Sequence, residues 1–262
     1  MSRGLVCIAT GTYDVFVDPL ISAVDANGTA DILFVLTDNA ARLTRSEDRV
    51  GRTTVQYLPW GSLPWPYPTL WRYVAISAYA DQFRDRVSHL VYCDVDMRPV
   101  GDCSALFDDV LVAVEHPGNL NRGNSTMPFV TDISSKAYTS PSQDSVYVAG
   151  GVQGGPVALY LEAVESCKSA ILDDYRRGVM AQWHDESHWN AYVDRAANVH
   201  VLGCEYCWPE TWAASDGLPA PRLLALDKDH HHLRGTSPGL RERLRKSKLG
   251  ESGVALIKRV KS

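Results

Sequence analysis

Short apolar runs alternate with stretches of helical periodicity in the first part of the chain. Residues 5–10 and 31–36 are continuous apolar runs, and residues 15–24 between them have the spacing of a helix. Unbroken runs of this length are typical of strands buried on both faces, and a helix between two of them is typical of a βαβ unit. The pattern therefore predicts a parallel sheet covered by helices.

The alternation continues along the chain. Residues 54–58 fit a further strand, and prolines at positions 59, 64, 66 and 68 then exclude regular structure up to Thr69. Apolar residues next recur at helical spacing, at Leu70, Tyr73, Ile76, Ala80 and Phe83. Residues 89–92, 110–114 and 146–148 are three more strand candidates. Pro156 opens a helix whose apolar face is Val157, Leu161, Val164, Cys167 and Ile171.

Composition supports one large globular domain. The chain has 262 residues, 45% hydrophobic and 22% charged, which suffices for a full α/β core. The net charge of -5 argues against a nucleic-acid-binding protein. Charge is uneven, however, because residues 240–262 contain eight Lys and Arg against two Glu. We therefore expect a domain over residues 1–239 and a separate basic tail over residues 240–262.

The two ends of the chain suggest a cellular setting. The sequence begins without an apolar signal region and has no run long enough to span a bilayer, so we expect a soluble, cytoplasmic protein. The basic tail is either disordered and solvated or a short surface helix that makes a peripheral contact with anionic lipid.

Two acidic clusters carry the candidate chemistry. Asp94 and Asp96 directly follow the apolar residues 89–92, so both carboxylates leave the carboxyl end of a buried strand, where open α/β sheets bind ligands. Such hard oxygens suit a divalent cation. The second cluster, Trp183-His184-Asp185-Glu186-Ser187-His188, stands before an amphipathic helix. Its two acids could instead compensate the helix dipole, for about 0.3 to 1 kcal/mol each. Together the clusters suggest a metal-dependent nucleotide-sugar transferase.

Other motifs point less clearly to chemistry. The glycines in residues 150–155 match neither a dinucleotide fingerprint nor a P-loop, and form either a tight strand-to-helix turn or a close approach to a sugar ring. Cys204 and Cys207 have CxxC spacing but no second pair. His184 and His188 have zinc-ligand spacing, with Glu186 out of register for a zinc hydrolase. Histidines 230–232 are a solvated loop or an incidental metal binder.

Six motifs follow one another along the chain. They are Asp94-Val95-Asp96-Met97, His116-Pro117-Gly118, Lys136-Ala137-Tyr138, Gly150-Gly151 with Gly154-Gly155, Trp183 to His188 with Asn190 and Tyr192, and Glu205-Tyr206-Cys207-Trp208. In their order and spacing the chain resembles glycosyltransferase family 6, the retaining α1,3-galactosyl- and N-acetylgalactosaminyltransferases, over roughly residues 5 to 235. The resemblance implies an α/β protein of the GT-A fold, a Rossmann-like mixed sheet flanked by helices in one catalytic domain.

The family resemblance also implies roles for individual residues. Asp94 and Asp96 are expected to hold Mn²⁺ on the donor diphosphate. Glu186 is the expected catalytic residue, either as a nucleophile or as a stabiliser of an oxocarbenium-like centre. Tyr13 is expected to stack on uracil and Asp185 to bind the donor sugar. The remaining expected donor residues are Ile8, Thr10, Arg72, Val95, Ala149, Gly150, Gly151 and Lys228. The expected acceptor residues are His116, Trp183 and Glu186.

Substrate preference rests on fewer residues. Ala149 and Gly151 occupy the positions that gate the C2 substituent of the donor sugar, and their small size favours UDP-GalNAc over UDP-Gal. The expected acceptor is the 3-hydroxyl of a β-galactoside, fucosylated and H-antigen-like, on an oligosaccharide or a lipid-linked glycan. Pro209 departs from the aspartate common at that position in the family, which leaves the acceptor open. For Arg72, a helix-surface position is the alternative to a site role.

Two functional interpretations remain open at this stage. The chain resembles a soluble bacterial-type member that kept the Asp-x-Asp motif, and hence a metal-dependent retaining hexosyltransferase. The alternative is a catalytically inactive carbohydrate or sugar-nucleotide binding protein. Intact Asp94, Asp96 and Glu186 favour the enzyme, because a binding module needs no carboxylate at the reacting face.

Overall fold

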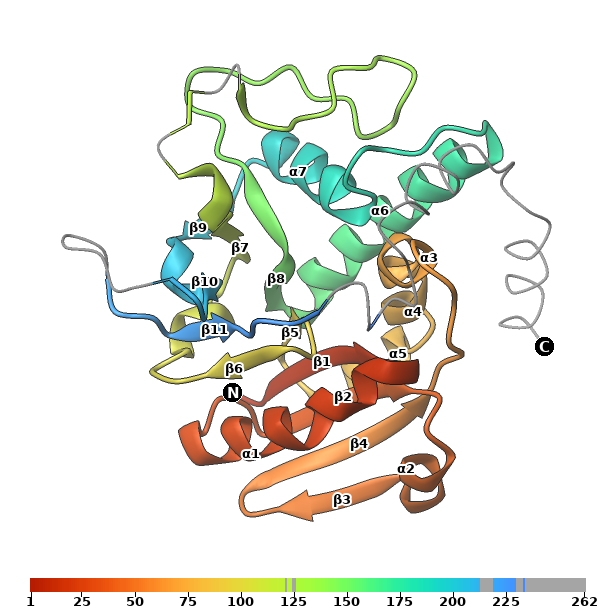
Figure 1. The fold of residues 1–262 in the computed structure, drawn as a ribbon, viewed down its shortest axis with the longest axis vertical. Coiled ribbons are helices and arrows are strands. Elements are labelled where there is room, and N and C mark those ends of the chain that lie inside the picture. Colours follow the sequence, from red (N-terminus) through yellow and green to blue (C-terminus); the bar gives the residue numbers. More distant parts are fainter. Residues whose placement is uncertain (121, 124–125, 213–218, 230–232, 234–262) are drawn as a thin grey trace.

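The computed structural model describes residues 1–120, 122–123, 126–212, 219–229 and 233. Within these residues the chain forms an eight-stranded mixed sheet in the order β3-β4-β2-β1-β5-β8-β7-β9 (Figure 1). The strands are β1 Arg3–Ala9, β2 Ile32–Thr37, β3 Glu47–Val50, β4 Thr53–Pro59, β5 His89–Cys93, β7 Leu111–Glu115, β8 Val148–Pro156 and β9 Val199–Leu202. The Rossmann-like mixed sheet flanked by helices is thereby confirmed.

The expectation of a parallel sheet is correct for six of the eight strands, since β7 and β9 also run in the direction of β5, and it is wrong for β3 and β8. β4, β2, β1 and β5 run parallel, as the βαβ pattern predicts. β3 is antiparallel to β4 because a tight turn at Gly51 and Arg52 joins them, and only antiparallel strands share such a turn. β8 is antiparallel to both β5 and β7 because the long connection after β7 returns the chain at the same end of the sheet, where Glu115 pairs with Val148.

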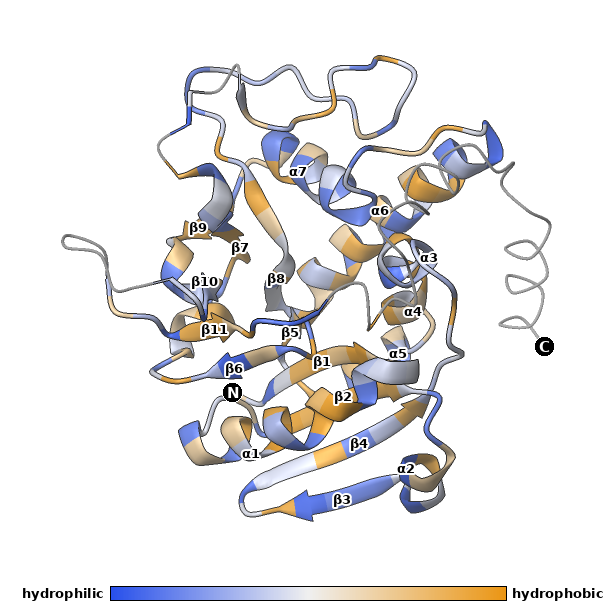
Figure 2. Cartoon of the chain, viewed as in Figure 1, coloured by the Kyte–Doolittle hydropathy of each residue, from blue (hydrophilic) through white to orange (hydrophobic). Residues whose placement is uncertain are grey.

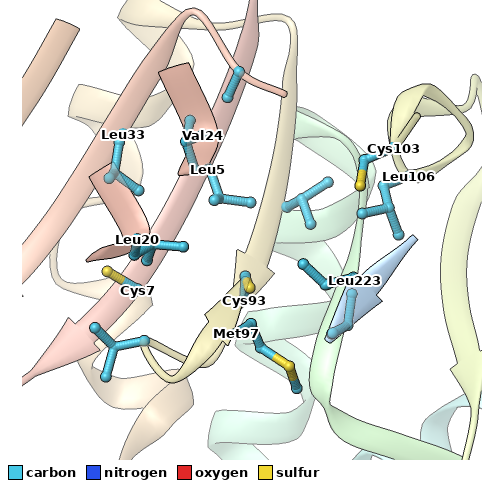
Figure 3. Packing of buried hydrophobic residues seen from close by; sticks show 14 of the residues in the cluster. Leu5, Cys7, Leu20, Val24, Leu33, Cys93, Met97, Cys103, Leu106 and Leu223 are labelled. Atoms are coloured by element: carbon cyan, nitrogen blue, oxygen red, sulfur yellow. The ribbon is translucent and has the colours of Figure 1, made fainter. Parts of the chain in front are cut away.

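Successive residues of the central strands serve two different cores. Leu5 and Cys7 pack in one cluster with Leu20 and Val24 of α1 (Val17–Asn27), while Val6 packs in the other. Figure 3 shows the first cluster, where β6 (Met97–Pro99) and β11 (Leu223–Ala225) complete the cover of this face. β6 and β11 form a small second sheet with β10 (Trp208–Pro209). Figure 2 shows the central strands β1 and β2 as strongly hydrophobic and the edge strand β3 as hydrophilic.

Helices α4 to α7 cover the opposite face of the sheet. These are α4 Arg72–Ser77, α5 Ala80–Arg86, α6 Val157–Arg176 and α7 Asp185–Arg195, which bury Tyr73, Phe83, Leu161 and Trp189 in the second cluster. The predicted apolar face of α6 is confirmed, since Leu161, Val164, Cys167 and Ile171 are all buried. In the part of the chain described here, no helix combines the length and apolar character needed to cross a bilayer.

Several segments differ from their predicted structure. The prediction of no regular structure up to Thr69 is wrong by two residues, because α3 (Tyr67–Leu70) begins at Tyr67 and accommodates Pro68 in its first turn, where a proline is tolerated. The periodic stretch after Thr69 is divided among α3, α4 and α5, because the backbone leaves helical dihedrals at Trp71 and Tyr79. The break at Trp71 starts α4 with Arg72 directed into the interior, where it is 5% exposed. The short helix α2 (Ala40–Arg45) and the edge strand β3 were not predicted, because neither has a clear apolar period.

The glycine-rich segment, residues 150–155, forms part of a strand. The prediction of a tight strand-to-helix turn there is wrong. Residues 150–155 lie inside β8, where a Cβ on Gly154 would come within 2.5 Å of the Leu90 carbonyl oxygen of β5. Gly155 has a φ of +141°, and a Cβ there would lie 2.6 Å from the Val110 carbonyl oxygen. Glycine is thus required because the backbones on both sides of β8 approach closely. Histidines 230–232 and the tail, residues 240–262, fall outside the described residues.

Candidate functional site

Two adjoining pockets lie at the carboxyl ends of β1 and β5, where α/β sheets bind ligands. The larger has a volume of about 340 Å³, and the predicted donor residues on its wall are Ile8, Thr10, Tyr13, Val95, Asp96 and Lys228. The smaller, of about 160 Å³, is lined by Gly150, Gly151, Trp183, His184, Asp185 and Glu186. Thr69, Arg72 and Asp94 line both pockets. A ligand in two parts could therefore occupy both, with its junction at these three residues.

An aromatic ring forms one wall of the larger pocket. Tyr13 lies in the 3-10 helix Gly11–Phe16 that follows β1, and Arg42 holds this turn through ion pairs with Asp14 and Asp18, each at 2.8 Å. The Arg42 guanidinium also lowers the pKa of Asp18 below its usual range. Because Arg42 is buried and bound to two carboxylates, the turn that carries Tyr13 is fixed relative to the sheet.

The segment near residue 228 forms the opposite wall of the larger pocket. The Lys228 ammonium lies 5.9 Å from the centre of the Tyr13 ring and forms an ion pair with Asp96. The Thr12 hydroxyl donates a 2.6 Å hydrogen bond to the Leu233 carbonyl oxygen. A cation and an aromatic face therefore flank this pocket together, an arrangement suited to a phosphorylated, planar-ringed ligand.

The two aspartates of the first cluster have different surroundings. Asp94 accepts hydrogen bonds on Oδ1 from the Tyr92 hydroxyl at 2.6 Å and from Arg72 Nη2 at 3.1 Å. Its Oδ2 faces Gly151, where a Cβ would lie 2.8 Å away. Asp96 is 3% exposed, and its Oδ2 accepts no hydrogen bond from any described residue beyond the ion pair with Lys228. Asp94 thus has its Oδ2 outside these two hydrogen bonds, and the Oδ2 of Asp96 pairs with the Lys228 ammonium.

These carboxylates fit a divalent cation that is shared with a phosphate. Among the described residues there is no cluster of three or more His, Cys, Asp and Glu side chains able to hold a metal alone. Mg²⁺-like cations are commonly held by one or two carboxylates, with substrate phosphates and water completing the shell. The CxxC pair does not fit a metal, because both thiols are buried and burial raises the pKa of Cys207 to about 12.

Arg72 lies at the centre of the acidic residues. Its guanidinium pairs with Asp185 at 2.8 Å and with Asp94 at 3.1 Å, and donates to the Gly150 carbonyl oxygen. The alternative of a surface arginine is therefore wrong. Burial raises the pKa of Asp185 to about 7, because the charge of Arg72 is shared and only partly offsets desolvation, and Asp94 and Glu186 add repulsion.

Glu186 is held by two hydrogen-bond donors. The Tyr147 hydroxyl donates to Oε1 and the Gly150 backbone N–H donates to Oε2, both at 2.9 Å. Tyr147 keeps its proton, because burial raises the pKa of its phenol far above its usual value. The carboxylate is thereby fixed at the wall of the smaller pocket.

Asn190 holds helix α7 against strand β8. Its side-chain oxygen accepts from the Val148 N–H at 2.8 Å, and its amide donates to the carbonyl oxygens of Val148 at 2.8 Å and Glu186 at 2.9 Å. One carboxamide thus satisfies both backbone groups of Val148, as a neighbouring strand would. His184, just before α7, has a φ of 53°, and such strain is common at functional sites. The acids that follow it turn into the pocket instead of capping the helix.

Two predicted residues lie outside the pocket walls. The His116 ring accepts from the Gly118 N–H at 3.0 Å and contacts Tyr147 edge to face, with ring centres 5.9 Å apart. Ala149 is 3% exposed and packs in the first core cluster. Thr69, Tyr92 and Tyr147 were not predicted as site residues. Of these three, only Tyr92 could have been found from the sequence. It precedes Asp94 by two positions, and residues two apart in an extended chain lie on the same face.

Comparison with known proteins gives a consistent picture. The sequence matches the family model described as glycosyltransferase family 6 over residues 1–235. The rat histo-blood group ABO system transferase 2 is 28% identical over 236 residues, covering 88% of this chain and 71% of that protein. The human globoside α-1,3-N-acetylgalactosaminyltransferase 1 is 29% identical over 241 residues, 89% and 69% of the two chains. An O-antigen biosynthesis glycosyltransferase of Escherichia coli is 26% identical over 174 residues, 65% and 72%.

Proposed function

The chain belongs to glycosyltransferase family 6, and on this premise we propose that it is a metal-dependent, retaining α1,3-glycosyltransferase. It moves GalNAc, or Gal, from a UDP-sugar to the 3-hydroxyl of a β-galactoside. The observation that carries the proposal is Glu186, whose carboxylate is pinned by Tyr147 and Gly150 at the wall of the smaller pocket. The names of the rat and human relatives support a histo-blood-group-like α1,3 transfer.

The larger pocket takes the UDP part of the donor. Tyr13 stacks on the uracil ring, and the backbone around Ile8 and Thr10 lies beneath the nucleoside. Arg72 and Lys228 supply positive charge at the diphosphate, since both line this pocket. Asp94 and Asp96 would hold Mn²⁺ between them and the diphosphate, where the ion would neutralise charge on the departing UDP.

The smaller pocket takes the transferred sugar. Asp185 and the Gly150 and Gly151 backbone face the sugar hydroxyls, and Trp183, which is 47% exposed, offers an aromatic face at the entrance to the acceptor. The Glu186 carboxylate faces the anomeric carbon, which becomes cationic as its bond to UDP breaks. A carboxylate oxygen of Glu186 either stabilises this carbon electrostatically while the acceptor hydroxyl attacks it, or forms a transient bond to it.

UDP-GalNAc is the proposed preferred donor. The support for it is the family resemblance, in which small residues at positions 149 and 151 leave room for an acetamido group, and of the two Gly151 lines the smaller pocket whereas Ala149 lies in the core. The donor preference therefore rests on Gly151. A higher kcat/KM for UDP-Gal than for UDP-GalNAc would contradict it.

The test is UDP release from each donor, with Mn²⁺ or with excess chelator, and with or without 2'-fucosyllactose as acceptor. We expect release that requires Mn²⁺ and rises with acceptor. The Glu186→Gln variant should bind UDP-sugar normally and lose transfer by about 10²-fold or more, as when one catalytic electrostatic group is removed. Glu162→Gln on the exposed side of α6 is the matched control. Full activity in chelator would overturn metal dependence, and sugar-nucleotide binding without turnover would favour the inactive binding protein.

Cytoplasmic location and lipid contact by the basic tail remain predictions. Vesicle sedimentation of the full chain and of a chain lacking residues 240–262 tests the lipid contact. Equal binding of the two forms to anionic vesicles would reject it.

A further inference from the structure

The side chain of Tyr92 contacts both of the charged groups shared by the two pockets, Arg72 and Asp94. It is 3% exposed at the carboxyl end of β5. Its hydroxyl donates to Asp94 Oδ1 at 2.6 Å, and the Arg72 guanidinium lies over its ring, 4.4 Å from the centre. One tyrosine thus contacts an expected metal ligand through its oxygen and the neighbouring cation through its ring.

We propose that Tyr92 is a positioning residue for the metal ligand Asp94, an inference that rests on the proposed function. Tyr92 and Arg72 both bind Oδ1, so two donors from different elements prevent rotation of the carboxylate. The other oxygen, Oδ2, takes no part in these two bonds and lies beside Gly151, whose missing side chain leaves room for it where the two pockets meet. Asp94 therefore offers Oδ2 to a cation, and its carboxylate is already oriented before the metal binds.

The chemistry of the phenol suits this role. A phenol has one O–H donor, and that of Tyr92 is directed at Asp94 Oδ1, 2.6 Å away. Its ring face also attracts the Arg72 guanidinium, which must pair with Asp94 and Asp185 together. Phenylalanine would retain the ring contact and lose only the donor, so the two contributions are separable.

The variant Tyr92→Phe tests the proposal by metal binding. Mn²⁺ is titrated into the full chain with a fixed concentration of UDP, and free Mn²⁺ is followed by its electron paramagnetic resonance signal, with UDP alone as the blank. We expect about ten-fold weaker Mn²⁺ binding, as is typical when a partner of a metal ligand is removed. UDP affinity in chelator should be unchanged.

Tyr160→Phe is the matched control. Tyr160 is fully buried in the same apolar cluster as Tyr92, and its hydroxyl has no hydrogen-bond partner among the described residues. The variant therefore removes a buried hydroxyl without removing a bond to Asp94, and it should bind Mn²⁺ like the unmodified chain. In turnover, Tyr92→Phe should raise the KM for Mn²⁺ about ten-fold and change kcat at saturating Mn²⁺ much less.

The outcomes separate this inference from the proposed function. Equal Mn²⁺ affinity of Tyr92→Phe and the unmodified chain would overturn the role of Tyr92 and leave the metal-dependent transferase in place. Equal weakening by Tyr92→Phe and Tyr160→Phe would also overturn it, since the effect would then be one of packing. Absence of Mn²⁺ binding by the unmodified chain would overturn both proposals.

Discussion

The buried carboxylate of Asp185 should make stability depend on pH in a direction unusual for an acid. Its pKa is raised to about 7 from an ordinary value of 3.8, mainly by burial. Between these two values the folded protein keeps a proton that the unfolded chain has released. The free energy of unfolding contributed by this group is therefore greatest at low pH and falls as pH rises towards 7.

The size of the effect follows from the pKa difference. One pKa unit corresponds to 1.36 kcal/mol, so Asp185 alone accounts for a decrease of about 4 kcal/mol across the window. His188 on the same helix has the opposite effect, because burial lowers its pKa to about 4 from 6.5. Its folded form resists protonation, so stability decreases by about 3 kcal/mol as pH falls through that range. In the unmodified protein the two slopes largely cancel.

The variant Asp185→Asn separates the two groups. It keeps the size and shape of the side chain and removes the titration, and the difference between an amide and a protonated acid beside Arg72 changes stability by an amount independent of pH. Urea unfolding is followed by tryptophan fluorescence, which the seven tryptophans permit, at intervals from about pH 4 to pH 7. As pH rises over this range, we expect the free energy of unfolding of the variant to increase by about 4 kcal/mol relative to that of the unmodified protein. Parallel stability curves for the two proteins would refute the reasoning.

Three further substitutions follow from the contacts. His188→Asn should remove the loss of stability between about pH 6.5 and pH 4, measured by the same unfolding series, and a steeper loss would contradict it. Asn190→Ala leaves both backbone groups of Val148 without partners and should cost about 2 to 4 kcal/mol, whereas the exposed Asn27→Ala should cost much less in the same urea titration. Gly154→Ala should separate β5 from β8 and lower the melting temperature sharply, while Gly61→Ala, with no atom within 4 Å of the new Cβ, should leave it nearly unchanged.

Much of the fold was predictable because local patterns record burial. The runs that became β1, β2, β4, β5 and β7 were identified from their continuous apolar character, and the face of α6 from its period. The placement of the acidic clusters after a strand and at a helix start followed from the same patterns, together with the motifs that resemble the family. Each of these features depends only on residues close together in the sequence, which lie in the same strand or helix.

The family resemblance predicted site roles for Arg72 and Glu186, but their partners were not predictable from local patterns, because those partners are remote in sequence. Arg72 is separated by 78 positions from Gly150, to which it donates, and its pairing with Asp185 is more distant still. Tyr147 and Glu186 are 39 positions apart. The orientation of β8 likewise depends on how a long connection returns to the sheet.

The linear chain was sufficient to locate the buried strands β1, β2, β4, β5 and β7 and the long helix α6, and to show which acids stand at element ends, because hydrophobic period and motif order are properties of the sequence. Only the folded chain shows that one buried arginine pairs with both Asp94 and Asp185, and that the hydroxyls of Tyr92 and Tyr147 donate to Asp94 and Glu186. Hydrogen bonds and ion pairs depend on distances of a few ångströms between side chains. Those distances exist only once the sheet has brought its strands together.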